Sequence, residues 1–184
     1  MGGFSPSDVN AYMKSQVPSN AYMSSGFSEM VLLLSLDFSV AYYFADWVGV
    51  RPSLLYFFSP KILVYGDTTQ SYVLHSLAPQ LSVDFAYDAG KLARLFVSPG
   101  LAYQAAWFEG YAAHGLGYEL ALGVDLSFGV ARAKGLSLAL VFREAKLDVS
   151  SGPTKSTGLY SPTPAVNTLD FSSVIFRIGF QWGI

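Results

Sequence analysis

The chain has 184 residues, enough for one domain with a substantial core, and a formal net charge of −2. Hydrophobic residues make up 52% of it and aromatic residues 16%, whereas charged residues make up 13%, about half the share usual in a soluble domain. The absence of cysteine excludes disulfides and thiolate metal sites, and the missing basic excess argues against a nucleic-acid partner.

The first 28 residues allow two interpretations. The run Ser5-Pro6-Ser7-Asp8 is typical of a helix start, because an acidic residue falls in the first turn. The alternation of Val9, Ala11 and Met13 with polar neighbours predicts instead a strand over residues 9–17. We prefer the strand, because together with the strands predicted below it makes an even total.

Seven further strands are predicted from apolar residues at alternate positions. They cover residues 30–43, 47–58, 72–87, 92–108, 117–130, 136–146 and 171–182. The connections 44–46, 88–91 and 131–135 are short, whereas 18–27, 59–71, 109–116 and 148–170 are longer and rich in Gly, Ser, Thr and Pro. The chain is therefore predicted to be all-β: a single domain over 1–184 that forms an up-and-down antiparallel transmembrane β-barrel of eight strands. Short turns and both chain ends would face the periplasm, and longer loops the outside.

One hairpin unit recurs along the chain. The segment Leu34–Ser39 is echoed by residues 81–86 and 122–127, and residues 50–56 are echoed by 97–103. Repetition of an up-and-down hairpin favours a closed barrel, which leaves no unpaired strand edge.

The two faces of the strands differ in size as well as polarity. One row is bulky and apolar, as in Leu77, Leu81 and Phe85, whereas the other is small and weakly polar, as in Ser82 and Ala86. A lipocalin-like soluble barrel would exchange the two faces, but Ser, Gly and Ala suit the crowded interior of a narrow barrel. Aromatic residues gather near both strand ends, as expected at membrane interfaces: Tyr42, Tyr87, Phe128, Phe180 and Trp182 at one end, and Tyr56, Phe58, Tyr103, Trp107, Tyr118 and Phe142 at the other.

The run Tyr42-Tyr43-Phe44-Ala45-Asp46-Trp47 and the last strand, residues 174–182, carry a family resemblance. The chain resembles the small eight-stranded outer-membrane proteins related to the OmpA, OmpX and OmpW barrels. It departs from them in lacking the final aromatic residue, since Trp182 is followed by Gly183 and Ile184. The resemblance implies the bacterial outer membrane as location and outer-membrane lipids and the barrel-assembly machinery as partners. Because no signal peptide is evident at Met1, an exported protein would here be a mature form.

Charged residues on the inward row near the short turns predict a plug. They are Asp37, Arg51, Asp84, Arg94, Asp125 and Arg177. Asp37 and Arg51 flank one short turn at similar distances, and Asp84 and Arg94 flank the next, so each pair is expected to meet across its hairpin. A satisfied salt-bridge network closing the barrel is the favoured interpretation.

Toward the longer loops the inward row becomes apolar and predicts a cup for a small hydrophobic ligand. The cup residues are Leu55, Phe57, Leu74, Phe108, Val141 and Ile175. Ordinary packing of a tapered barrel end is an equal alternative. The resemblance to OmpW-like proteins implies passage of hydrophobic compounds that leave sideways between strands, and Pro52 and Pro99 remove ladder donors from the wall.

Two other functions stay open. A lipid A deacylase or acyltransferase would need a Ser, a His and an acid, for which His75, Ser76, His114 and Glu119 are candidates; yet neighbours in a strand point to opposite faces, so no catalytic residues are assigned. A surface protein would contact a host component through residues 148–170, which are rich in Ser, Thr, Pro and Gly. No cofactor and no metal site is predicted.

Overall fold

The computed structural model describes residues 6–17, 30, 34–65, 67–128, 134–152 and 166–182. One helix, α1 (Ser7–Gln16), precedes ten strands, and the described chain is otherwise all-β. The strands are β1 (Leu34–Ser39), β2 (Tyr42–Ala45), β3 (Val48–Tyr65), β4 (Thr68–Asp88), β5 (Ala93–Phe108), β6 (Tyr111–Phe128), β7 (Lys134–Glu144), β8 (Lys146–Ser151), β9 (Thr168–Asp170) and β10 (Ser173–Trp182).

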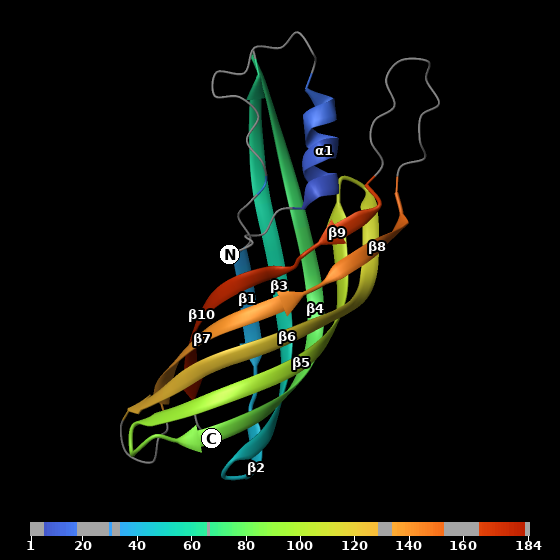
Figure 1. Cartoon of the computed structure of the whole chain (residues 1–184). Coiled ribbons are helices and arrows are strands. Elements are labelled where there is room, and N and C mark those ends of the chain that lie inside the picture. Colours follow the sequence, from blue (N-terminus) through green and yellow to red (C-terminus); the bar gives the residue numbers. More distant parts are fainter. Residues whose placement is uncertain are drawn as a thin grey trace.

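All the strands belong to one sheet, and neighbours in it run antiparallel. Its order is β1-β3-β4-β5-β6-β7-β10, with β2 beside β3, and with β8 between β6 and β9. The predicted up-and-down order is thus confirmed. Figure 1 shows the sheet curving strongly. Arg177 of β10 pairs with Asp37 of β1 at 3.2 Å, so the sheet curls until its two edges approach each other. No backbone ladder joins these edges within the described residues.

The prediction of a strand over residues 9–17 is wrong, because this segment forms α1. Val9 and Met13 are both fully buried, and a spacing of four residues places them on one helical face. A stretch this short fits a period of two and a period of 3.6 equally well. The helix lies at the end of the sheet that carries the β5–β6 turn, since Tyr12 packs on Tyr111. We call this the helix end, and the end with the β4–β5 turn (residues 89–92) the opposite end.

Two of the predicted long loops are also wrong. Residues 59–71 belong almost entirely to β3 and β4, which stay paired from Val48↔Phe85 up to Tyr65↔Thr68. Residues 109–116 shrink to the two-residue turn Glu109–Gly110, where φ is 47° and 82°. Positive φ at both central residues fits a type I′ hairpin, whose twist matches the flanking strands. Only the connection between β8 and β9 remains long among the predicted loops that flank described strands.

Prolines account for the break between β1 and β2 and for the breaks in the β4–β5 ladder. The first strand is interrupted between β1 and β2, at Val40 and Ala41, where the register places Pro52 of β3 opposite. Proline lacks the N–H that would complete the pair, and only the bond from Val40 N–H to Pro52 O remains, at 3.1 Å. The β4–β5 register likewise skips the positions of Pro79 and Pro99.

The two faces of the sheet are as predicted, with the bulky row outside. Along β4 exposed and buried residues alternate: Leu81 is 57% exposed and Phe85 46%, whereas Ser82 is 3% exposed and Asp84 fully buried. The inner row consists mainly of small residues because the interior has no space for larger side chains at these positions. A Cβ added to Gly123 would lie 2.5 Å from the Phe96 ring and from Leu138 O. Small residues therefore leave the interior to a few large side chains.

Candidate functional site

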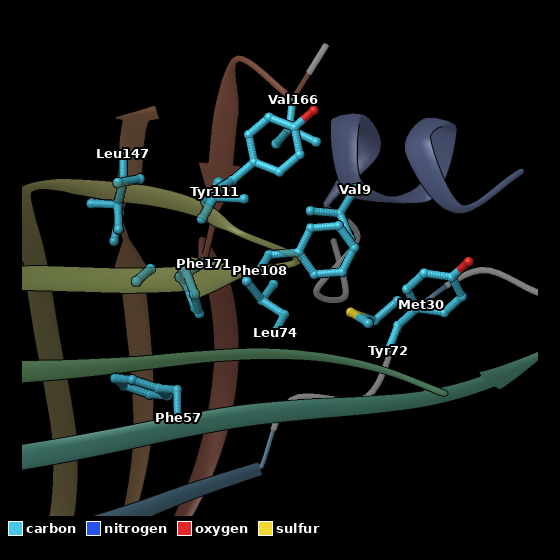
Figure 2. Close-up of a cluster of buried hydrophobic side chains, with 14 of the residues drawn as sticks. Val9, Met30, Phe57, Tyr72, Leu74, Phe108, Tyr111, Leu147, Val166 and Phe171 are labelled. Atoms are coloured by element: carbon cyan, nitrogen blue, oxygen red, sulfur yellow. The ribbon is translucent and has the colours of Figure 1, made fainter. Parts of the chain in front are cut away.

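Five of the six cup residues are brought together in one cluster that α1 covers. Leu55, Phe57, Leu74 and Phe108 are at most 1% exposed and belong to one buried cluster, which also contains Val9 and Met13 of α1 and Met30. Ile175 packs against this cluster, whereas the fully buried Val141 belongs to a second one with Phe96. Figure 2 shows Val9 and Met30 beside Leu74, Phe108 and Tyr72. The apolar cup is therefore filled by the N-terminal part of the same chain.

Polar contacts at the edge of the cup also hold α1 in place. One Asp8 carboxylate oxygen accepts hydrogen bonds from the Asn167 and Thr168 backbone N–H groups, both at 3.1 Å, and from the Thr168 hydroxyl at 3.3 Å. Asn10 accepts from Met30 N–H at 2.6 Å. Because Asp8 lies in the first turn, its charge also suits the positive end of the helix dipole. These bonds tie α1 to β9 and to the segment that follows the helix.

Edge-on aromatic contacts also pack α1 against the sheet. The Tyr12 ring meets the rings of Phe108 and Tyr111 edge-on, at centroid distances of 5.6 and 5.7 Å. Burial, and to a smaller extent the nearby Tyr111 and Glu109, raise the pKa of the Tyr12 phenol above its usual 10.0. The docked helix thus favours the neutral phenol.

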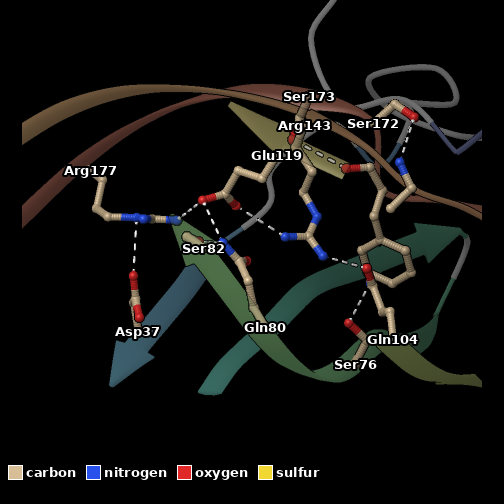
Figure 3. Close-up of polar contacts among 12 residues, drawn as sticks. Asp37, Ser76, Gln80, Ser82, Gln104, Glu119, Arg143, Ser172, Ser173 and Arg177 are labelled. Carbon is tan, nitrogen blue, oxygen red and sulfur yellow. Dashed lines mark hydrogen bonds and ion pairs between the residues drawn. The ribbon is translucent and has the colours of Figure 1, made fainter. Parts of the chain in front are cut away.

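A layer of ionic side chains lies below the cup, drawn in Figure 3. Glu119, whose side chain is 2% exposed, pairs with Arg143 at 3.3 Å and with Arg177 at 2.8 Å, and Arg177 also reaches Asp37. Gln104 accepts from Arg143 at 2.6 Å and donates to Ser76 at 2.7 Å. The Arg143 guanidinium lies 4.4 Å from the centre of the Phe57 ring. This layer therefore forms the floor of the cup.

A second polar cluster lies nearer the opposite end. Both oxygens of the buried Asp84 are engaged: one accepts from Arg51 at 2.7 Å and from the Tyr43 hydroxyl at 3.1 Å, and the other from the Ser98 hydroxyl at 2.5 Å. Asp125 accepts from Ser137 at 2.7 Å. Between the two clusters remains a cavity of about 20 Å³, room for one water molecule.

The predicted plug residues all face the interior or its mouth, but the predicted pairings are wrong. Asp37 binds Arg177, Arg51 binds Asp84, and Arg94 binds Asp88. Register is the reason. Asp37 lies opposite Leu55, four residues from Arg51, or about 13 Å along a strand. Asp88, directly opposite Arg94, outcompetes Asp84 for this arginine.

Sequence reasoning missed the centre of the ionic layer. Arg143 was not assigned to the interior, and Glu119 was considered only as a catalytic acid. Both stand on the inward row. Glu119 lies two residues before Ala121 and Arg143 two residues after Val141, so each pair shares a face of its strand, and all four residues are buried. A strict count by twos along β6 and β7 would have placed them in the interior.

The candidate enzyme residues are not brought together. Ser76 is buried and accepts from Gln104, whereas His75 lies on the outer row against Trp107, with ring centroids 5.7 Å apart. His114 is exposed and stacks on Tyr103. In the described part of the chain, no three His, Cys, Asp or Glu residues are grouped so that they could hold a metal ion.

Several predictions fall outside the described residues. These include most of the loop 148–170, the connection 18–27, the side chains of Phe128, Phe180 and Trp182 in the aromatic rows, and both chain ends.

No known protein matches this chain in the three comparisons that follow. Family models give no match to this chain, curated proteins give none, and neither do solved structures. A search of the described residues also finds no helix with the length and hydropathy needed to span a membrane.

Proposed function

We propose that the chain is an integral β-barrel of the bacterial outer membrane that binds small hydrophobic molecules in the cup beneath α1. The observation that supports it is the inverted polarity of the sheet. Large apolar residues such as Phe38, Leu81 and Phe176 stand exposed at alternate positions, whereas the charged residues Asp84 and Glu119 are buried. An exposed apolar surface of this extent is unfavourable in water and suits a lipid environment.

Closure of the sheet into a barrel is part of this proposal. The Asp37–Arg177 pair brings the edges β1 and β10 together, and closure would leave no exposed strand edge in lipid. The registers make both edge strands run in the same direction. The seven sheet positions of the described residues would then close with one parallel pair. This odd number departs from the even strand numbers of bacterial single-chain barrels and has a parallel in the 19 strands of mitochondrial VDAC.

The cup supports binding of an apolar molecule rather than conduction of ions. The cup walls are aliphatic and aromatic, and α1 fills the cup through only two fully buried side chains, Val9 and Met13. A ligand that replaced these two side chains would keep the apolar contacts of the walls. The floor of Glu119, Arg143 and Arg177 blocks a straight path to the opposite end.

A molecule that passes on would have to leave sideways. At the level of the cup, the ladder between β4 and β5 is interrupted at Pro79, next to Ala78 of the buried cluster. A wall with missing ladder bonds opens at lower cost than a continuous one. We therefore place the exit between β4 and β5.

Titration of the refolded protein in non-ionic detergent with the apolar fluorescent probe N-phenyl-1-naphthylamine tests the ligand part. We expect saturable binding with one site per chain, and no discrete conductance steps in planar bilayers. A signal equal to that of empty micelles would reject the ligand, and stepwise ion conductance would reject the closed floor.

A further inference from the structure

A groove runs over the outer wall where β6, β7 and β10 meet the short strands β8 and β9. Its volume is about 680 Å³, within the range of small-molecule sites. Figure 1 shows β8 and β9 side by side beyond the ends of β7 and β10 at the helix end. Most residues that line the groove stand on the exposed row of the sheet, whereas the cup lies on the buried row. The buried Glu119 and Arg143 of the cup floor, and Ser173, also line the groove.

The groove coincides with a break in the wall that side chains stabilise. The ladder between β7 and β10 ends at Ser173↔Arg143 and resumes between β8 and β9 at Lys146↔Asp170. In the gap, the Ala145 N–H donates to the Ser172 hydroxyl at 3.2 Å, and the Ser172 N–H donates to Asp170 at 2.8 Å. Side-chain oxygens thus replace the missing ladder acceptors, so the break is a built feature of the wall.

The lining changes from apolar to charged along the groove. One half is formed by Tyr118, Leu120, Phe142 and Val174, and the other by Glu144, Lys146 and Asp170. On β7 the change falls between Phe142 and Glu144, two successive residues of the exposed row. In a membrane-spanning wall, such a change marks the level where acyl chains give way to head groups.

We propose that this groove binds one phospholipid with a zwitterionic head group. An acyl chain would lie along Leu120, Phe142 and Val174, the phosphate would pair with Lys146, and the ammonium group with Glu144 and Asp170. One cation beside two anions matches a head group that carries both signs and disfavours a purely anionic one. The inference rests on the membrane location proposed above and does not require a ligand in the cup.

Native mass spectrometry of the refolded full chain in detergent, with equal amounts of phosphatidylethanolamine and phosphatidylglycerol, tests the site. We expect one phosphatidylethanolamine to be retained about tenfold more than phosphatidylglycerol, and Lys146→Gln to weaken this retention about threefold to tenfold, as for a lost charged hydrogen bond. Lys91→Gln, at an exposed lysine near the opposite end, should change nothing. For the apolar half, Leu120→Ala should weaken retention, whereas Leu81→Ala, outside the groove, should not.

Equal retention of both lipids, or equal effects of Lys146→Gln and Lys91→Gln, would overturn the site. Flotation with phosphatidylcholine vesicles separates this failure from that of the proposed function. A protein that floats without retaining the lipid selectively rejects only the groove, whereas a protein that stays out of the vesicles rejects the membrane location and the groove with it.

Discussion

Replacing Met13 with alanine should loosen α1 and open the cup to apolar molecules. Met13 is fully buried in the cluster that α1 shares with Leu74 and Phe108. Truncating a buried methionine costs about 2 to 5 kcal/mol, and here this cost falls on the docked state of the helix. If a ligand binds only when α1 has left, its apparent affinity rises with the undocked fraction, and 2 kcal/mol corresponds to an increase of about 30-fold.

The assay is the titration with N-phenyl-1-naphthylamine, run beside hydrogen exchange of the α1 amides. Asp8→Ala supplies a second, graded variant, because it removes the rim bonds to Asn167 and Thr168 without making a cavity. Asp8 is half-buried and keeps some contact with solvent, so we expect about 1 kcal/mol and about a fivefold gain in affinity. Lys14→Ala, at an exposed neighbour on the same helix, is the control and should leave affinity and exchange unchanged. Faster exchange of α1 without any gain in probe affinity would refute the idea that the helix covers the binding site.

Three further predictions concern the interior. Glu119→Gln should lower the free energy of unfolding by about 3 to 5 kcal/mol, because Arg143 and Arg177 lose a buried counter-charge. Glu109→Gln, in the exposed turn, should change it by less than about 0.5 kcal/mol. Equal effects of the two variants in urea titrations would contradict the ionic floor. Gly123→Ala should lower the free energy of unfolding by about 1 to 3 kcal/mol, because the new methyl group forces the Phe96 ring aside. Gly179→Ala should be tolerated, since its added Cβ would come no closer than 3.7 Å to Ser137. If both variants proved neutral in the same titrations, the interior would not be crowded at Gly123. Docking raises the pKa of Tyr12, so this contribution to docking is fully present below pH 10 and is lost as the pH rises through the raised pKa. Probe affinity should therefore increase above pH 10 in the wild type but not in Tyr12→Phe. A parallel rise in both proteins would assign the effect to another group.

The period of two predicted the faces of the sheet well because it follows from strand geometry alone. Leu81 and Ser82 fall on the faces expected of them, and so do the cup residues Leu55 and Leu74. Pairing partners depend instead on register, which turn geometry sets. The sequence therefore placed Asp37 and Arg51 on the correct row, yet Arg51 meets Asp84 of the next strand.

The failures at α1 and in the loops have a common physical origin. Over a stretch as short as residues 9–17, tertiary contacts decide between helix and strand, and here the apolar cup provides a seat for Val9 and Met13. Residues 59–71 looked like a loop because Pro60 and several polar residues interrupt the pattern. Pro60 is nevertheless accommodated within β3, at an exposed position opposite Val73.

The most direct test of the account is the depth of the exposed row in a membrane. A single tryptophan placed by Leu81→Trp, in a background where Trp47, Trp107 and Trp182 are replaced by phenylalanine, reports on the middle of the outer row of β4. After refolding into vesicles of phospholipids brominated deep in their acyl chains, its fluorescence should be strongly quenched. Fluorescence unaffected by the brominated lipids, from a protein that remains in solution, would contradict the proposal that this sheet is a membrane wall.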